Sequence, residues 1–399
     1  MITPVISKSK IHSFLATGMF FLVVLIMTRQ VPLKPFSSLM NLALFGFFAF
    51  QANFILQKTE RSRLILLQLI VGWGFLMLGY SAAFGNSLGT SLRFLIILVL
   101  IQGAFFINPK TSYIRILIGF LVLQSVFLIS LHLILNLFFN MSSYMFLRLF
   151  FQAQGWGDVY TFNGLFYNIQ ILGNALLPFG VFVSLIYYTG IKRVIFTGIL
   201  FVGMLVAGNF AFLLGVTFFM ISLFLVTEKY STKKFVAGFF VLIMIGILVA
   251  QPAMNYLDKT VSAKAQESNP TRIDQAEVLW GNLTENPLNF LLGKGLGNTL
   301  KVKTKWRDYT DNIYFELQSL YFLNQMGILN FLIFVGANIG LVFLFLTNTK
   351  VKVIYFAYIL YAFFNPYFLD TSHIVVIITL VSLNQALEKR ESHLLPNEV

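Results

Sequence analysis

Most of the acidic side chains in this chain lie in one stretch, between residues 252 and 326. Glu316 lies there among apolar and aromatic neighbours, with Ile313, Tyr314 and Phe315 before it and Leu317 after it. Such surroundings remove water from a carboxylate and make it a stronger base. Glu316 is therefore a candidate general base that takes a proton from a hydroxyl group. The alternative is an acid in the first turn of a helix that only complements the helix dipole.

Basic residues in the same stretch could hold an anion. Arg272 is the sharpest candidate, because a guanidinium group can bind two phosphate oxygens at once. Its alternative is a surface ion pair with Asp274 or Glu277. Lys294 and an alternating run could add positive charge; the run consists of Lys301, Lys303, Lys305 and Arg307. That run either neutralises a phosphate-bearing substrate or faces solvent and lipid headgroups.

The remaining motifs are weaker. Gly293-x-Gly295-x-Gly297 follows no predicted strand, which argues against a nucleotide site. It predicts a tight turn, or a turn whose N–H groups help to hold an anion. The four histidines have no neighbours at metal-ligand spacing, so no metal and no cofactor is expected. Of these, only His132 is expected at depth in a span, where it is a functional candidate or, as its lack of ionisable neighbours favours, a hydrogen-bonded core residue.

The composition restricts the class of protein that positions these residues. Apolar residues make up 58% of the 399 residues and charged residues 11%, so a soluble enzyme is excluded. At about 20 residues per crossing, the apolar runs predict an all-α polytopic integral membrane protein with about twelve transmembrane helices. The predicted spans are Ile11–Met27, Ser38–Leu56, Leu64–Phe84, Leu92–Ile107, Ile114–Phe139, Gly164–Tyr188, Val194–Ala207, Phe210–Thr227, Phe235–Gln251, Gly327–Leu346, Val353–Leu369 and Ile374–Leu387.

Lysine and arginine set the expected orientation. They gather in alternate short connections, around Lys58, Lys110, Lys192 and Lys350, and are sparse in the others. The positive-inside rule then places both termini in the cytoplasm. The net charge of +13 comes with no nucleic-acid-binding motif, so no nucleic acid is expected as a partner.

Three regions follow from this topology. Residues 1–251 hold nine spans, residues 252–326 form a large, partly helical outer loop, and residues 327–399 hold three spans and a cytoplasmic tail. Asn269-Pro270 predicts the start of an amphipathic helix with Ile273, Ala276, Trp280 and Leu283 at helical spacing. A second helix is expected from about Tyr314. A further outer segment, Asn140–Asn163, carries Arg148 and is expected to pack against the loop.

This arrangement resembles the O-antigen polymerase and ligase superfamily, whose polymerases are of the Wzy type. Members are polytopic, with cytoplasmic ends and a large periplasmic loop late in the chain. The motifs that carry the resemblance are Arg272 with Trp280, Pro287 with Gly293-x-Gly295-x-Gly297, Asn312-x-Tyr314-x-Glu316, and Gly327-Ile328-Leu329. Ligases resemble this pattern but hold a His followed by Asn where this chain has Glu316-Leu317, which favours a polymerase.

The resemblance implies a GT-C-like fold and a metal-independent glycosyltransferase in the bacterial inner membrane. Its partners would be undecaprenyl-diphosphate-linked oligosaccharides, membrane lipids, a chain-length regulator and a flippase. Glu316 would be the catalytic base. The residues implied to hold the diphosphate are Arg272, Lys294, Lys301, Lys303 and Arg307, and those implied to position the loop and substrate are Arg148, Trp280, Asp311 and Tyr314. A ligase of the same superfamily and a lipid-linked oligosaccharide flippase are the alternatives.

Overall fold

The computed structural model describes residues 8–28, 37–58, 60–161, 166–171, 173–226, 270–304 and 308–394. These residues are mostly helical. The long helices are α1 (Lys8–Met27), α2 (Ser37–Lys58), α3 (Arg61–Ala83), α4 (Leu88–Gly103), α5 (Thr111–Phe138), α7 (Leu177–Tyr187), α8 (Gly190–Val206), α9 (Phe210–Val226), α12 (Gln318–Phe345), α13 (Thr349–Phe363) and α14 (Thr371–Leu394). Shorter elements are η1 (Ala104–Phe106), η2 (Met141–Ser143), α6 (Tyr144–Ala153), β1 (Asp158–Thr161), β2 (Tyr167–Gln170), η3 (Asn174–Leu176), α11 (Pro287–Leu292) and an unlabelled helix of residues 270–283.

In the part of the chain that the structure describes, six helices are long and apolar enough to cross a membrane, which is compatible with a helical membrane protein. They are Leu39–Leu56, Arg61–Ala83, Leu88–Phe106, Thr111–Phe138, Gln318–Phe345 and Thr371–Ser392. The apolar helices Ile11–Met27, Asn174–Tyr187 and Phe210–Val226 are shorter. The predicted count of about twelve spans is therefore not confirmed. The predicted span Phe235–Gln251 lies outside the described residues.

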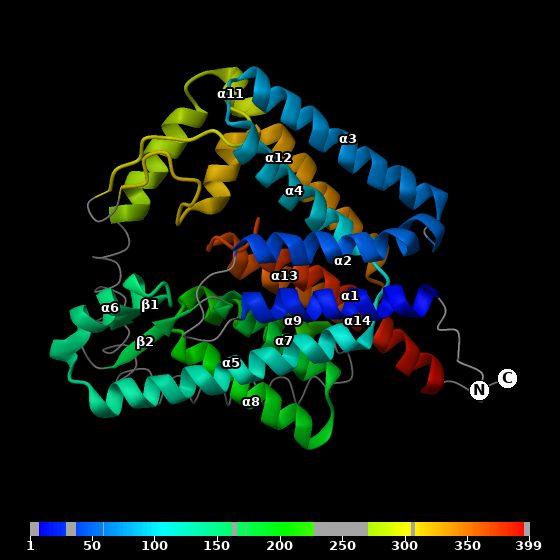
Figure 1. Ribbon diagram of the computed structural model, residues 1–399, viewed down its shortest axis with the longest axis vertical. Coiled ribbons are helices and arrows are strands. Elements are labelled where there is room, and N and C mark those ends of the chain that lie inside the picture. The colour runs from blue at the N-terminus through cyan, green and yellow to red at the C-terminus, as the bar shows by residue number, and fades with distance from the viewer. Residues whose placement is uncertain are drawn as a thin grey trace.

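The helices form one bundle with a buried centre. Figure 1 shows α3, α4 and α12 together on one side of α1, α2, α13 and α14, and α5, α7 and α8 on the other. In the spanning part of α14, 78% of the residues are buried, against 22% for α3. A helix covered on all sides needs apolar side chains all round. The run from Ile374 to Ile378 in α14 supplies them.

The contacts between helix ends fall into two groups at opposite ends of the bundle. At one end, the Lys110 backbone N–H donates to Ser382 Oγ at 3.2 Å, and Arg390 Nη1 donates to the Tyr187 carbonyl at 2.7 Å. The start of α1 and the end of α14 also lie at this end (Figure 1). These connections are the ones in which the sequence concentrates Lys and Arg.

The other end of the bundle brings together the connections that are poor in Lys and Arg. Asn86, between α3 and α4, donates from Nδ2 to the Lys294 carbonyl at 2.8 Å. Asn209, between α8 and α9, donates to Asn365, between α13 and α14, at 3.0 Å. Among the described residues, the α3–α4, α8–α9 and α13–α14 connections therefore lie at this end.

The predicted span Gly164–Tyr188 is wrong in its first half. Its residues include strand β2, which pairs antiparallel with β1 so that Asp158 lies opposite Gln170. The helix begins only after Gly173, whose φ of 87° is left-handed and interrupts a helix. Side chains of α5 hold the strand: Asn136 accepts from the Tyr167 N–H at 2.9 Å, and His132 Nδ1 lies 2.7 Å from the Tyr167 carbonyl oxygen.

The histidine at depth is not only His132. His373, near the start of α14, is fully buried, whereas His132 is half-buried. The His373 Nδ1 atom lies 2.8 Å from the Phe368 carbonyl oxygen, and the His373 ring contacts the rings of Tyr355 and Tyr358. Hydropathy placed His373 outside the last span; the structure buries it because α14 begins before that span and runs through the centre of the bundle.

Candidate functional site

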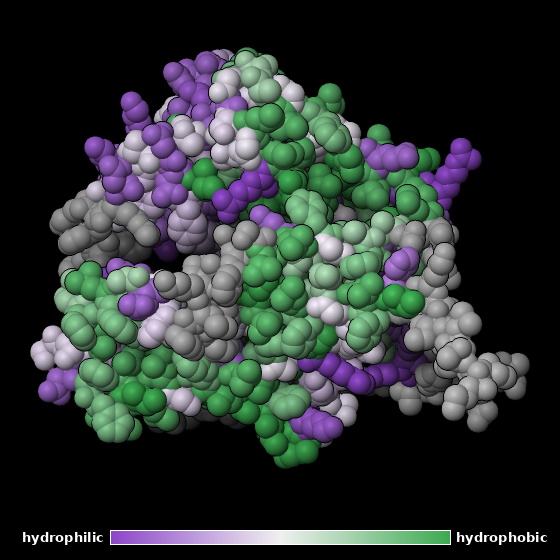
Figure 2. Space-filling view, viewed as in Figure 1, coloured by the Kyte–Doolittle hydropathy of each residue, from purple (hydrophilic) through white to green (hydrophobic). Residues whose placement is uncertain are grey.

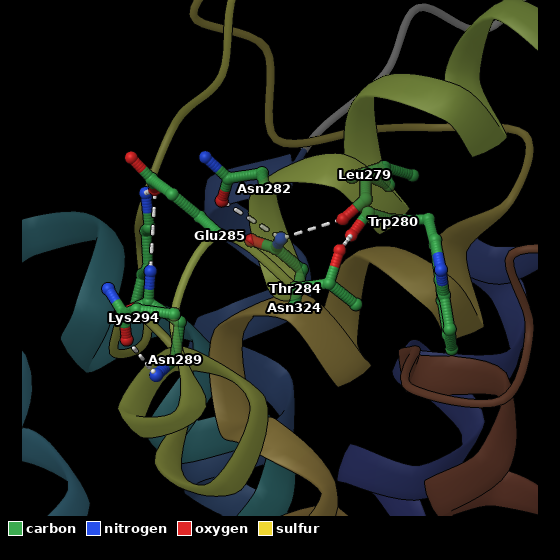
Figure 3. Close-up of polar contacts among 9 residues, drawn as sticks. Leu279, Trp280, Asn282, Thr284, Glu285, Asn289, Lys294 and Asn324 are labelled. Carbon is green, nitrogen blue, oxygen red and sulfur yellow. Dashed lines mark hydrogen bonds and ion pairs between the residues drawn. The ribbon is translucent and has the colours of Figure 1, made fainter.

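The helix of residues 270–283 is anchored on α12 through an amide. Asn324 Nδ2 donates to the Leu279 carbonyl at 3.0 Å and to Asn282 Oδ1 at 2.9 Å (Figure 3). Trp280 points away from this contact and is 52% exposed. Ile273 is exposed as well, so the apolar positions predicted from helical spacing do not all face the protein.

The buried face of this helix is instead partly polar. Thr271, Gln275, Leu279 and Leu283 recur every fourth residue and are all buried. Because residues four apart lie on the same face of a helix, this stripe turns the neighbouring Arg272 toward the edge of the contact with the start of α12. The loop helix therefore begins where the sequence predicts, and the face that it turns toward the protein is this stripe, which includes Thr271 and Gln275.

Glu316 lies in a turn immediately before α12. The predicted helix from about Tyr314 begins only at Gln318. Two glutamine side chains explain why the helix begins later than predicted, because they accept hydrogen bonds from backbone N–H groups before it. Gln318 Oε1 accepts from the Phe315 N–H at 2.9 Å, and Gln275 Oε1 accepts from the Leu317 N–H at 3.1 Å. The peptide groups on both sides of Glu316 are thereby fixed, and its carboxylate is held at the helix 270–283.

Arg272 and Glu316 meet directly. Arg272 Nε lies 3.3 Å from Glu316 Oε2, and the side chains are 42% and 33% exposed. The alternative pairing of Arg272 with Asp274 or Glu277 is not the one the structure contains. The Tyr309 hydroxyl approaches the second carboxylate oxygen, Oε1, at 3.5 Å. The candidate base, Glu316, and the candidate anion-binding group, Arg272, are therefore in contact, and both are partly exposed.

Tyr309 is a member of this site that the sequence did not indicate. It is buried, and its ring stacks on Phe315 with the centroids 5.6 Å apart. Its backbone N–H donates to the Val302 carbonyl at 2.8 Å. Tyr309 thus connects the basic run to Glu316. A phenol seven residues before a carboxylate is no recognisable motif, which is why the sequence did not reveal it.

Two members of the basic run, Lys301 and Lys303, lie among the described residues, and Lys305 does not. Lys303 pairs with Asp308 across an isolated bridge, with Nζ and Oδ2 3.7 Å apart, and Lys301 is exposed. A hydrogen bond from Thr310, with Lys303 nearby, lowers the pKa of Asp308. Arg307 lies outside the described residues, as do the loop residues 252–269.

Asp311 and Tyr314 lie in the segment that leads from Asp308 to α12. Asp311 has a φ of 55°, its N–H donates to the Leu300 carbonyl at 3.1 Å, and its carboxylate accepts from Thr299 at 3.3 Å. A left-handed backbone is uncommon for a residue with a side chain and marks a fixed turn. Tyr314 follows, with a ring that is 47% exposed.

The glycine-rich turn does not form an anion cradle. The N–H groups of Lys294 and Gly295 donate to the carbonyls of Asn324 and Gln325, and that of Gly297 donates to Gln325 Oε1. An anion would need these groups unoccupied. The Lys294 ammonium group itself pairs with Glu285, whose carboxylate also accepts from Asn289 (Figure 3). The turn fastens the loop to α12 and to the α3–α4 connection.

Arg148 serves a second cluster. Its Nε and Nη2 atoms lie 3.1 and 3.2 Å from the two carboxylate oxygens of Asp158, and its Nη1 donates to Tyr144 at 2.9 Å. Burial lowers the pKa of Arg148, but Asp158 and Tyr144 outweigh it and the pKa is raised overall. Arg148 therefore braces α6 against β1 as a permanently charged group.

The two clusters lie on the same side of the molecule in Figure 1, with the segment of residues 270–304 above and α6 with β1 below. Figure 2 shows that the surface of the upper region is largely hydrophilic. Within the described ranges, no three His, Asp or Glu side chains are grouped so as to hold a metal ion. Known protein families, curated proteins and solved structures contain no match to this chain.

Proposed function

We propose that this chain is a membrane glycosyltransferase of the polysaccharide-polymerase type. It would transfer a growing glycan from undecaprenyl diphosphate to a lipid-linked repeat unit. The observation that supports this most directly is the Arg272–Glu316 pair, 3.3 Å apart and half-exposed at the edge of the large loop. Glycosyl transfer from a diphosphate lipid needs these two groups side by side, a base for the acceptor and a cation for the leaving group.

The bond changes assign a role to each group. Glu316 takes the proton from an acceptor hydroxyl as its oxygen attacks the anomeric carbon of the donor sugar. The bond from that carbon to the diphosphate oxygen breaks, and its electron pair remains on the diphosphate. Arg272 binds the oxygens on which this charge develops, and Lys301 and Lys303 add positive charge nearby.

The resting ion pair fits this cycle. A bound diphosphate competes with Glu316 for the Arg272 guanidinium group, because both offer oxygens to the same donors. Binding of the donor would therefore release the carboxylate at the moment when a base is required. Tyr309, 3.5 Å from Oε1, would keep the released carboxylate oriented toward the acceptor.

The proposal also assigns a side of the membrane. The end of the bundle that gathers Lys110 and Arg390 faces the cytoplasm under the positive-inside rule. Glu316, at the other end, then faces away from the cytoplasm, where lipid-linked repeat units are available after export. The proposal thus includes cytoplasmic termini, a location in the bacterial inner membrane and the GT-C-like architecture that the resemblance implies.

A reconstituted extension assay tests the proposal. Wild-type protein in liposomes, given synthetic diphosphate-linked repeat units, should form longer glycans, and Glu316→Gln should reduce the rate at least about 100-fold. Glu277→Gln is the matched control, because Glu277 is an exposed carboxylate on the same loop helix and should leave the rate unchanged.

The products separate the alternatives. Transfer only to an acceptor that carries no lipid diphosphate would indicate a ligase. Movement of intact lipid-linked sugar across the bilayer without extension would indicate a flippase. Either result, or full activity of Glu316→Gln, would contradict the proposed polymerase mechanism.

A further inference from the structure

Polar side chains from segments far apart in the sequence converge on the same end of the bundle as Glu316. We call them the tyrosine–amide face; they are Tyr160, Gln170, Asn209, Asn365 and Tyr367. They come from β1, from β2, from the α8–α9 connection and from the α13–α14 connection. Gln170 is exposed and the other four are half-buried, so all of them reach the surface.

In the part of the face that lies on the β1–β2 hairpin, the Tyr160 hydroxyl group makes the connecting hydrogen bonds. Gln170 Nε2 donates to Tyr160 Oη at 3.3 Å, and the Tyr160 hydroxyl donates to the Ala207 carbonyl at 2.6 Å. These bonds connect the hairpin to the end of α8. The Gln170 side chain itself is exposed at the surface.

The second half is a pair of amides. Asn209 Nδ2 donates to Asn365 Oδ1 at 3.0 Å, while Asn209 Oδ1 accepts from the Ala211 N–H at 3.0 Å. Asn365 Nδ2 donates to the Tyr361 carbonyl at 2.8 Å. Both amides are thereby fixed in orientation. A ligand that bonds to their remaining donor and acceptor sites would lose less side-chain entropy on binding.

The face is joined to the candidate active site through the start of α12. Ser319 Oγ, three residues after Glu316, donates to the Phe363 carbonyl at 2.8 Å. Phe363 is the last residue of α13 and precedes Asn365 by two residues. The α13–α14 connection, which carries Asn365 and Tyr367, therefore lies beside the turn that holds Glu316.

A buried amide donor without a hydrogen-bond partner lies beside the tyrosine–amide face. Asn168 is 2% exposed, and its Nδ2 atom has no hydrogen-bond partner among the described residues. Its Oδ1 atom and Tyr160 Oη would each lie 2.7 Å from a Cβ built on Gly208. A buried amide donor without a partner costs free energy, so an unused donor of this kind next to a polar surface points to a ligand or water.

The chemistry of the face indicates the class of ligand. Its five side chains carry no formal charge, so they do not suit a free phosphate or diphosphate. Amides and phenols both donate and accept hydrogen bonds, and phenol rings also offer a flat apolar surface. A sugar presents the complementary groups, hydroxyls around its rim and C–H bonds on its faces. We propose that the tyrosine–amide face binds the oligosaccharide portion of a lipid-linked glycan, which extends from Glu316 toward the β1–β2 hairpin.

This inference deepens the proposed function, and a binding measurement tests it separately from catalysis. The probes are oligosaccharides released by partial acid hydrolysis of the host cell's surface polysaccharide, and sugar-free undecaprenyl diphosphate. Both are titrated by calorimetry into the full-length protein in lipid nanodiscs. Gln170→Ala and Tyr367→Phe should each weaken oligosaccharide binding about five- to tenfold, the effect of one lost hydrogen bond, and leave diphosphate binding unchanged.

Gln152→Ala is the matched control, since Gln152 is an exposed amide on α6 that donates to Asp158 and lies outside the face. Equal oligosaccharide affinity in wild type and both variants would overturn the inference, as would a wild type that binds none of the released oligosaccharides while it extends glycans. Weakened binding in both variants, in a protein that extends no glycan, would uphold the glycan-binding face and reject the polymerase.

Discussion

Arg272 Nε and Glu316 Oε2 lie 3.3 Å apart although the two residues are 44 positions apart in the chain. Two structures bring them together: the buried stripe of the helix 270–283 and the turn that delays the start of α12. Gln275 belongs to both, because it lies in the stripe and accepts from the Leu317 N–H at 3.1 Å. The pair is therefore set by backbone anchoring and not by its own charges, which are half-exposed and screened.

Replacement of Arg272 by Lys tests whether geometry or charge matters. Lysine keeps the positive charge but loses the planar fork that binds two oxygens. We expect the extension rate of Arg272→Lys to fall about 100-fold, with the protein folded as judged by size-exclusion chromatography. Arg193→Lys is the control, because Arg193 donates to the Tyr188 carbonyl at the other end of the bundle. Wild-type turnover in Arg272→Lys would reduce Arg272 to a structural ion pair.

The sequence predicted the helices well where apolar runs are long. The bounds of α2, α3 and α5 differ by only a few residues from the predicted spans Ser38–Leu56, Leu64–Phe84 and Ile114–Phe139. Apolar runs of this length have no stable alternative in a bilayer, because each backbone N–H and carbonyl must be paired within the segment.

The hairpin β1–β2 could not be predicted in the same way. Its residues are aromatic and apolar, so hydropathy alone assigned part of it to a span. What decides the outcome is non-local: Asn136 and His132 on α5 bind the backbone of Tyr167. Tyr309 and Gln275 were missed at the candidate site for the same reason, since their roles depend on contacts between distant segments.

Gly293 provides a test of how firmly the loop is fastened. A Cβ at this position would lie 2.3 Å from the Gln325 carbonyl oxygen and 2.4 Å from the Gly327 nitrogen, and the φ of 77° is unfavourable for other residues. Gly293→Ala should lower stability by about 2–5 kcal/mol, from the left-handed backbone and the collision together. Thermal unfolding in detergent, followed by circular dichroism, would measure the loss.

The matched control for that variant is Gly281→Ala. Gly281 lies in the helix 270–283, and a Cβ there would meet no atom within 4 Å. Alanine should leave stability unchanged or raise it by about 0.5–1 kcal/mol, because it loses less conformational freedom in a helix. Equal unfolding temperatures for both variants would show that the glycine turn is not packed as described.

Arg148 and Asp158 should be energetically coupled. The two hydrogen bonds between them are in fork geometry, but the side chains are 35% and 31% exposed, so solvent weakens the interaction. A double-mutant cycle with Arg148→Ala and Asp158→Asn should give a coupling free energy of about 0.5–1 kcal/mol. A coupling near zero would mean that α6 is held against β1 by its aromatic contacts, such as Phe151 with Trp156.

The side of the membrane that Glu316 faces can be tested by labelling introduced cysteines. The chain contains no cysteine of its own that would react. Lys301→Cys replaces an exposed residue near Glu316, and Lys192→Cys replaces an exposed residue at the opposite end of the bundle. A maleimide that cannot cross membranes should label Lys301→Cys in intact cells with a permeable outer membrane, and Lys192→Cys only after the inner membrane is opened. The positive-inside rule requires this order. The reverse pattern would place Glu316 in the cytoplasm, where exported lipid-linked repeat units are out of reach, and would overturn the proposed reaction.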